Sequence, residues 1–338
     1  MKKSLLAMAL MGGIASAASA QTNVTIYGIV DVGLNHVNDG KASVTRMDSG
    51  ILNGSRIGFR GSEDLGGGMA ANFQLENGFS TDDGTLRQGG RLWGRRSWVG
   101  LSGDFGAIRL GRQDNPVHTL LDAIDPFGTG LTGNIENFFN SYDSRSDNVV
   151  SYLTPTIGGF FGQISYGLGE VPGSTATGRL LAGMAGYKSG PLNVQIAYHN
   201  QNVADTNIGI GNDKTTTIGG VYDFKVLKLH MAYAWNKGNR LGEQTTDSND
   251  MMLGVTVPVG ARSNVLASVL HKKSKLDAHP TSTLLALGYT YALSKRTTLY
   301  TAYGRNTNSS GGTLGPDGID VDPNATGSSI NLGIQHRF

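Results

Sequence analysis

The side chains best suited to catalysis do not form a recognisable set. The chain has no cysteine, and we find no G-x-S-x-G, H-E-x-x-H, P-loop or dinucleotide-binding pattern. The histidines are scattered without metal-ligand spacing, as at His118, His199, His230 and His271. We therefore expect no catalytic residues, no metal site and no cofactor.

Charged side chains are the more informative group. The segment from Gln113 to Asp143 contains five acidic residues and no lysine or arginine. Its length is typical of a functional or disordered loop. A second acidic group, in 317–322, could loosely hold a divalent cation, although a solvated loop is the better interpretation. Charges opposed across water would act on ions and dipoles, so the elements that carry them decide the function.

Those elements are predicted to be β-strands. Apolar residues alternate with small or polar ones at a period of two, for example in 229–236, 284–291 and 330–338. After residue 20 no apolar run is long enough for a transmembrane helix. Seven short turns and eight long polar connections predict sixteen antiparallel strands. The long connections are expected near 37–54, 78–91, 113–143, 169–179, 200–213, 236–249, 272–281 and 305–327.

Composition places the apolar face outside. Glycine supplies 50 of 338 residues, about twice its usual share of about 7%. Charged residues make up 16%, against about 25% in typical soluble domains. The second strand face is small and polar rather than charged, which favours a transmembrane barrel with lipid outside and water inside. A net charge of +2 argues against a nucleic-acid binder.

The first twenty residues form a predicted signal peptide. Lys2 and Lys3 precede an apolar stretch, and Ala18-Ser19-Ala20 fits a cleavage site. The domain division is therefore a signal peptide at 1–20 and one β-barrel at 21–338. Export into an oxidising compartment without cysteine is consistent with a fold that needs no disulfides.

Strand alternation also predicts which arginines face the lumen. If Ile57 and Phe59 face lipid, Arg56 and Arg60 point inward. If Trp98 faces lipid, Arg96 shares its side and Arg95 points inward, although Val99 and Leu101 weaken this assignment.

In the segment 145–153, Val150 and Tyr152 face outward, so Arg145, Asp147 and Ser151 face inward. Each of these arginines could alternatively pair with a loop acid and only hold the loop.

Several segments resemble the Gram-negative general porins of the neisserial and β-proteobacterial branch. They are 23–31, 55–68, 109–112, 149–155, 293–297 and the C-terminal His336-Arg337-Phe338. The resemblance implies a homotrimer of sixteen-stranded barrels with long loops outside and both termini in the periplasm. It also implies that the strand ending at Phe338 is read by the outer-membrane assembly machinery, and that the barrel sits among outer-membrane lipid and lipopolysaccharide.

In the family, a third loop folds into the barrel and its acids face a wall of arginines. The resemblance maps the wall onto Arg56, Arg95 and Arg145, and alternation adds Arg60. The loop acids would be Asp122, Asp125 and Glu136. The turn at 125–128 differs from the family pattern at its first position. The expected function is passive diffusion of ions and small hydrophilic solutes, with a mild preference for anions. A hydrolase in a barrel wall and a receptor or adhesin barrel with a closed lumen remain the alternatives.

Overall fold

The computed structural model describes residues 23–205, 209–240 and 243–338, and the predicted signal peptide lies outside them. No helix in these ranges is long and apolar enough to cross a membrane. The described residues include three short helical segments: α2 (Pro116–Ile124), η1 (Ile135–Asn137) and η2 (Pro316–Gly318). The strands are β1 (Asn23–Asn38), β2 (Ser43–Ser49), β3 (Arg56–Gly66), β4 (Met69–Gly78), β5 (Arg96–Gly103), β6 (Gly106–Asp114), β7 (Arg145–Leu153), β8 (Phe160–Gly167), β9 (Leu180–Ser189), β10 (Leu192–Asp205), β11 (Gly209–Asp223), β12 (Lys228–Arg240), β13 (Glu243–Val259), β14 (Ser263–Ser274), β15 (Thr281–Ala292), β16 (Thr297–Ser309) and β17 (Gly327–Arg337).

The strands form one closed antiparallel barrel. From β3 onward each strand pairs with its neighbours in the chain, and β1 closes the ring by pairing with β17. On its other edge β1 pairs with β2 through residues 32–38 and with β3 through residues 23–29. β2 and β3 therefore share one place in the wall, so the seventeen strands occupy sixteen positions. The predicted sixteen-stranded barrel is confirmed, and closure pairs the first strand with the last.

Alternation along the strands separates an apolar exterior from an interior of small and polar residues. On β12, Met231 is 52% exposed and Trp235 is 46% exposed, whereas Ala234 between them is completely buried. On β15, Leu285 and Leu287 are exposed and Ala286 is buried. An exposed face made of large apolar side chains is what a lipid-facing barrel wall requires.

The strands extend further into the predicted loops than expected. Residues 43–49, placed in a long connection by the sequence, form β2 and pair with β1. β10 runs to Asp205 and β13 begins at Glu243, so the connections predicted at 200–213 and 236–249 are much shorter. Polar side chains end the lipid-facing pattern, but backbone pairing of a hairpin continues in water without an apolar face. The prediction therefore marked the end of the lipid-facing pattern rather than the end of the strand.

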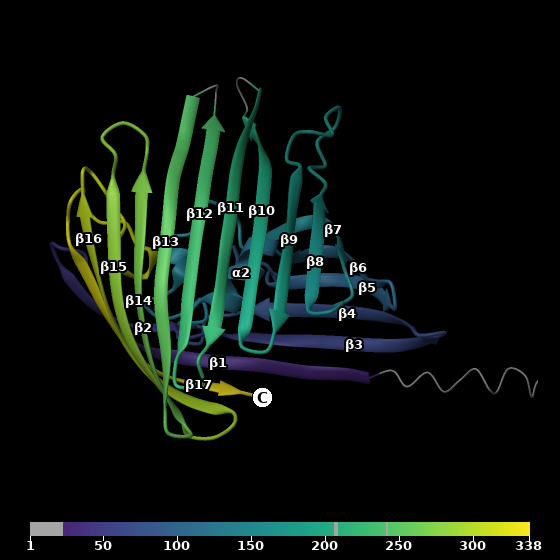
Figure 1. The fold of residues 1–338 in the computed structure, drawn as a ribbon, viewed down its shortest axis with the longest axis horizontal. Helices are drawn as coiled ribbons and strands as arrows, with labels where there is room; N and C mark the ends of the chain where they lie inside the picture. The colour runs from purple at the N-terminus through teal and green to yellow at the C-terminus, as the bar shows by residue number, and fades with distance from the viewer. Residues whose placement is uncertain (1–22, 206–208, 241–242) are drawn as a thin grey trace, which may run out of the picture.

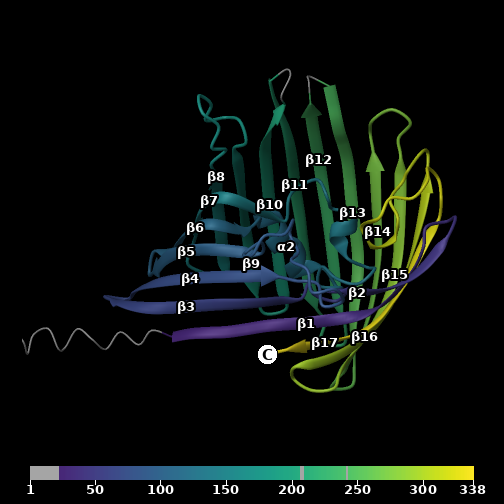
Figure 2. The same cartoon turned by 180° about the vertical axis from the view of Figure 1, so that it is seen from behind.

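Two sides of the barrel differ in form (Figures 1 and 2). β10 to β16 are long and stand beside one another, while β5 to β8 are only eight or nine residues each. The segment between β6 and β7 carries α2, which contacts β9, β10 and β11. Both views show α2 between the two sides of the barrel.

Candidate functional site

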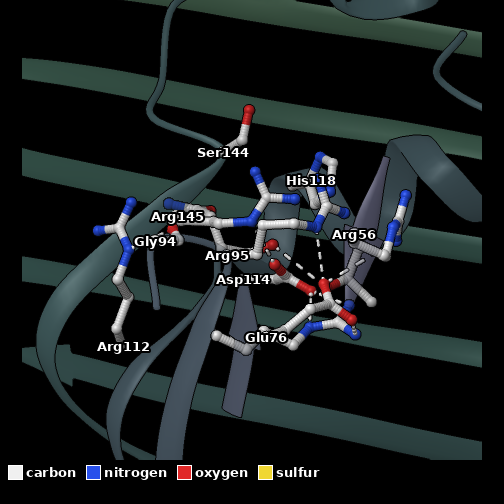
Figure 3. A network of polar contacts seen from close by, with 12 residues as sticks. Arg56, Glu76, Gly94, Arg95, Arg112, Asp114, His118, Ser144 and Arg145 are labelled. Carbon is white, nitrogen blue, oxygen red and sulfur yellow. Dashed lines mark hydrogen bonds and ion pairs between the residues drawn. The ribbon is translucent and has the colours of Figure 1, made fainter. Parts of the chain in front are cut away.

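A buried carboxylate on β4 gathers three arginines on one side of the lumen (Figure 3). Glu76 Oε1 lies 2.7 Å from Arg95 Nε and 3.9 Å from Arg56 Nη1. Its other oxygen, Oε2, lies 3.7 Å from Arg96 Nη1. The Glu76 side chain is 1% exposed, and a carboxylate so buried requires opposite charge and hydrogen bonds to compensate for lost hydration.

Asp114, at the end of β6, extends this network. It pairs with Arg96, which donates from Nε at 2.8 Å, and its Oδ1 lies 3.1 Å from Arg145 Nε. Four guanidinium groups thus surround two carboxylates, which leaves an excess of positive charge. We call the set the arginine cluster: Arg56, Glu76, Arg95, Arg96, Asp114 and Arg145.

Strand register brings the centre of this cluster together. Glu76 is directly opposite Gly58 on β3 and Arg96 on β5, and cross-strand partners share a face. A Cβ on Gly58 would lie 2.4 Å from the Tyr27 ring, so only glycine leaves room for that ring. The Tyr27 hydroxyl then donates to Glu76 Oε2 at 2.7 Å, which fixes the carboxylate in place.

Trp98 faces the lumen, contrary to the prediction. Val99 is 59% exposed and Leu101 47% exposed on the outer face of β5. The Trp98 ring instead lies 4.5 Å from the guanidinium carbon of Arg109. Two aliphatic residues set the lipid face here, and an inward tryptophan gains a cation–π contact.

This correction moves Arg96 into the lumen, because it shares the side of Trp98. Arg95 precedes the first residue of β5, where strand alternation no longer applies. Its contact with Glu76 agrees with the predicted inward position, but not with the reason for that prediction.

The acidic segment between β6 and β7 is anchored on the opposite side of the lumen from the arginine cluster. We call this side, formed by β10 to β16, the far wall. The Asn115 side chain caps α2 by accepting from Val117 N at 3.0 Å and also bonds His199 on β10 at 2.8 Å. At the other end of α2, His230 Nδ1 on β12 lies 2.7 Å from Ile124 O. Both ends of the helix are therefore tied to strands distant from β6.

The far wall receives this segment through small residues. An added Cβ at any of four glycines on the inner faces of β11, β13, β15 and β16 would lie within 2.8 Å of a segment side chain. Alanines on β10, β12, β15 and β16 complete the contact. The four glycines are Gly219, Gly254, Gly288 and Gly304. The segment side chains that they help to bury are Val117, Leu120, Leu121, Ile124, Phe127, Leu131, Ile135, Phe138 and Phe139.

Glu136 forms the polar anchor of the segment. Its Oε1 lies 2.7 Å from His118 Nδ1 and accepts from the Tyr142 hydroxyl at 2.5 Å and from Ser144 Oγ at 3.2 Å. Burial would raise the pKa of Glu136, but the hydrogen bond and electrostatic attraction of His118 bring that pKa below its ordinary value. The carboxylate therefore stays ionised beside the lumen.

Asp125 lines the cavity beside the arginine cluster, but its hydrogen bonds lie within its own loop. Its carboxylate accepts from the backbone N–H groups of Phe127, Thr129 and Ile135 at 3.1, 2.9 and 3.1 Å. Burial outweighs these hydrogen bonds and raises the pKa of Asp125 to about 7. Its carboxylate organises the turn of the segment and does not pair with the wall arginines.

Asp122 is the loop acid that is exposed to the lumen. It accepts from Thr129 Oγ1 at 3.0 Å and lines the same cavity as the arginine cluster.

Two predicted residues lie away from the cluster. Arg60 is exposed, and its guanidinium carbon lies 5.3 Å from the Tyr27 ring. Phe338 exchanges two backbone hydrogen bonds of 3.1 Å with Gly28 and lays its ring over that glycine. Phe338 thus completes the pairing of the last strand with the first, on the outer face of the barrel.

A cavity of 810 Å³ joins the arginine cluster to the acidic segment. Its lining includes Asp122, Asp125 and Glu136 as acids, against eight cationic side chains. Four of those belong to the arginine cluster, and four lie near the short-turn end of the barrel. The latter are Lys228, Lys295, Arg296 and Arg337. The cavity is therefore predominantly basic.

Alternation could have found the carboxylate that organises the cluster. Phe73 and Leu75 place Asn72, Gln74 and Glu76 on the lumen face of β4. Glu76 was missed because the search for acids was limited to the long loop. Arg96 was assigned to the wrong face, and Asp114 was counted with the loop. In the ranges that the structure covers, no group of three His, Asp or Glu side chains could hold a metal ion.

Comparison with known proteins agrees with this geometry. The Gram-negative porin family matches residues 5–311. The chain is 35% identical to an outer membrane porin protein of Bordetella pertussis and 34% identical to outer membrane porin protein 32 of Delftia acidovorans, with all of each chain covered. It is 28% identical to major outer membrane protein P.IB of Neisseria gonorrhoeae over 90% of this chain and 93% of that protein.

A solved structure, the anion-selective porin from Comamonas acidovorans, matches with a TM-score of 0.86 at 31% identity. The match covers 94% of this chain and 100% of that one. The chain therefore belongs to the Gram-negative porin family. It is an outer-membrane β-barrel that forms a channel for passive diffusion, as the sequence predicts.

Proposed function

We propose that the arginine cluster and the acidic segment form the narrowest part of the channel and give it a preference for small anions. The observation that carries this proposal is the excess of cations around the 810 Å³ cavity, eight against three acids. Two of those acids have their carboxylates engaged within the segment, which leaves Asp122 as the acid exposed to the lumen.

The physical basis is a fixed electric field in a confined space. Arginine stays protonated at working pH, so the wall charge is permanent. In open solution that charge would be screened within about 8 Å at physiological ionic strength. A narrow ring with low-dielectric walls focuses the field and raises the local concentration of anions. Binding at the ring must stay weak enough for release, so flow follows the concentration gradient.

Reversal potentials in planar bilayers test this proposal. Arg95→Ala and Arg145→Ala each remove a guanidinium of the cluster, and both are expected to shift selectivity towards cations with little loss of folding. Arg60→Ala is the matched control, because Arg60 faces Tyr27 outside the cavity lining. Parental reversal potentials in both cluster variants would overturn the assignment.

We also infer that the protein is not an enzyme and that residues 1–20 direct its export. Homotrimer formation, contact with lipopolysaccharide, and recognition of the Phe338 strand by the assembly machinery complete the proposal. The porin family and the apolar outer face, for example Leu332 at 57% exposure, support a membrane-embedded assembly. Native mass spectrometry of detergent-purified protein would test the trimer, and a monomer mass alone would contradict it.

A hydrolytic activity lost on changing a single serine or histidine would contradict the non-enzymatic assignment.

A further inference from the structure

The wall of the barrel is interrupted beside the constriction. β2 ends at Ser49 and β3 begins at Arg56, and residues 50–55 leave the sheet between them. Ile51 and Leu52 pack against the apolar cluster formed by the acidic segment and the far wall. We call residues 50–55 the bridging segment.

Asp31 on β1 holds the bridging segment. Its Oδ1 accepts from Ile51 N at 3.0 Å and lies 3.4 Å from Leu52 N, and its Oδ2 accepts from Asn53 N at 3.1 Å. The backbone of Asp31 adds further hydrogen bonds: Gly50 N donates to its carbonyl oxygen at 2.9 Å, and its N–H donates to Ser55 Oγ at 3.0 Å. Almost every residue of the bridging segment is therefore tied to Asp31.

The same carboxylate also binds the last two strands of the barrel. The Tyr300 hydroxyl on β16 donates to Oδ1 at 2.7 Å, and Gln335 Nε2 on β17 donates to Oδ2 at 3.0 Å. Asp31 is completely buried. Burial of a carboxylate costs free energy, and the converging donors explain why the site needs an acceptor on both oxygens, which asparagine would not supply.

The bridging segment touches both halves of the proposed constriction. On the loop side, Leu131 N donates to Ile51 O at 2.5 Å, and a Cβ on Gly130 would lie 1.9 Å from Leu52 O. On the wall side, Gly54 O accepts from Arg56 Nε at 2.8 Å.

The wall side has a second contact, since a Cβ on Gly54 would lie 3.0 Å from Arg95 Nη1. The distance between the loop and these arginines therefore depends on where the bridging segment lies.

We infer that Asp31 is a positioning residue of the channel. By holding the bridging segment, it sets the spacing between the wall arginines and the acidic segment. Because two of its donors come from β16 and β17, that spacing is established only when the barrel is closed. This inference rests on the proposed constriction and adds the residue that sets its width.

Single-channel recording of Asp31→Asn tests the inference. An asparagine presents an amide N–H₂ where Asp31 accepts, so the bridging segment loses its anchor on one side. We expect severalfold larger open-channel current noise and a reduced anion preference, while the heat-resistant folded band on gels is retained. Parental noise together with a parental reversal potential would overturn the inference.

Two further variants separate positioning from general stability. Tyr300→Phe removes one hydrogen bond on the barrel-closure side and leaves the bridging segment anchored, so its noise is expected to be parental. Gly130→Ala leaves Asp31 intact but forces the loop away from Leu52 O, so it is expected to reproduce the noise of Asp31→Asn. If Asp31→Asn does not fold, parental noise in Gly130→Ala overturns the inference. Equal noise in Tyr300→Phe and Asp31→Asn also overturns it, because closure alone would then explain the effect.

The cluster variants distinguish this inference from the proposed function. If Arg95→Ala and Arg145→Ala shift the reversal potential while Asp31→Asn behaves as the parent, the constriction stands and only the positioning role fails. If neither cluster variant shifts it, the constriction itself is wrong, and the positioning role fails with it.

Discussion

The two sides of the lumen use the same strand alternation for opposite purposes. The charged wall, formed by the inner faces of β3 to β7, carries the arginine cluster. The docking wall, which is the far wall formed by the inner faces of β10 to β16, carries glycine, alanine and larger apolar residues such as Leu270 and Leu284. It holds the apolar face of the acidic segment. Both walls present large apolar residues outward. The comparison shows that an inner face is polar where it meets water, and small or apolar where it meets another part of the chain.

The energetics of the two walls differ accordingly. The docking wall gains stability from apolar burial, at roughly 25 cal/mol per Å² removed from water. The charged wall gains little from its ion pairs, because removing charges from water offsets much of their attraction. It keeps four guanidinium groups against two carboxylates, an imbalance that ion pairing alone does not require.

The largest expected effect tests what both walls share, their lipid-facing exterior. Leu287 on β15 is 56% exposed, and Leu287→Arg would place a charge in the hydrocarbon, which costs about 2–4 kcal/mol near the bilayer midplane. Urea unfolding in lipid vesicles should show a corresponding loss of stability. Leu287→Met is the control for the change of shape. Parental stability of the arginine variant would contradict the outward assignment.

The next effect would break the docking wall alone. In Gly304→Val the new Cβ would lie 2.3 Å from Thr132 Oγ1, and overpacking of this kind costs about 1–3 kcal/mol. We expect a displaced acidic segment and a changed single-channel conductance, with the barrel still folded. Gly183→Val is the control, because its nearest contact is Gln163 O at 3.1 Å and no atom of the acidic segment lies close. Equal conductance in both variants would show that the position of the acidic segment does not depend on the space left by Gly304.

The smallest effect concerns pH and sharpens the comparison at Asp125. Its pKa is about 7 in the docked segment, against an ordinary 3.8, so the protonated form is favoured by docking. Protonated Asp125 therefore stabilises the docked segment. This contribution is complete below the ordinary pKa of 3.8 and is lost as pH rises through about 7. Open-channel noise should therefore increase from acidic to alkaline pH, and Asp125→Asn should remove the dependence. An unchanged pH profile in that variant would assign the effect to another group.

The barrel could be predicted closely because its rule is local. Pairs such as Leu285 with Leu287 repeat at every second residue, and lipid outside imposes the same requirement on every strand. Trp98 shows where this rule is ambiguous: a large aromatic residue suits lipid, but it also suits an inward contact with Arg109. Arg56 and Arg145 both line the lumen cavity. Ile57 and Phe59 give a clear alternation beside Arg56, whereas a register shift separates Arg145 from Val150 and Tyr152, so alternation alone does not fix the side of Arg145.

The site was predicted only in part because its partners come from distant strands. Strand register places Glu76 opposite Arg96, and Arg96 pairs in turn with Asp114 on β6, while Arg95 reaches Glu76 from just before β5. No short sequence pattern encodes these meetings. Asp125 looked like a pore acid from its position in the loop, yet its carboxylate turns towards three backbone N–H groups. The role of Asp31 was not visible either, since its donors lie as far along the chain as Gln335.

From the amino-acid order alone came the lipid-facing exterior, the number of wall positions and the candidate arginines, because a two-residue period and a solvent boundary act on each strand separately. Tertiary structure alone decided which charges meet, where the acidic segment rests and what holds the bridging segment. Those outcomes depend on closing the ring, which brings β1 beside β17 and sets residues from opposite ends of the chain within hydrogen-bond distance.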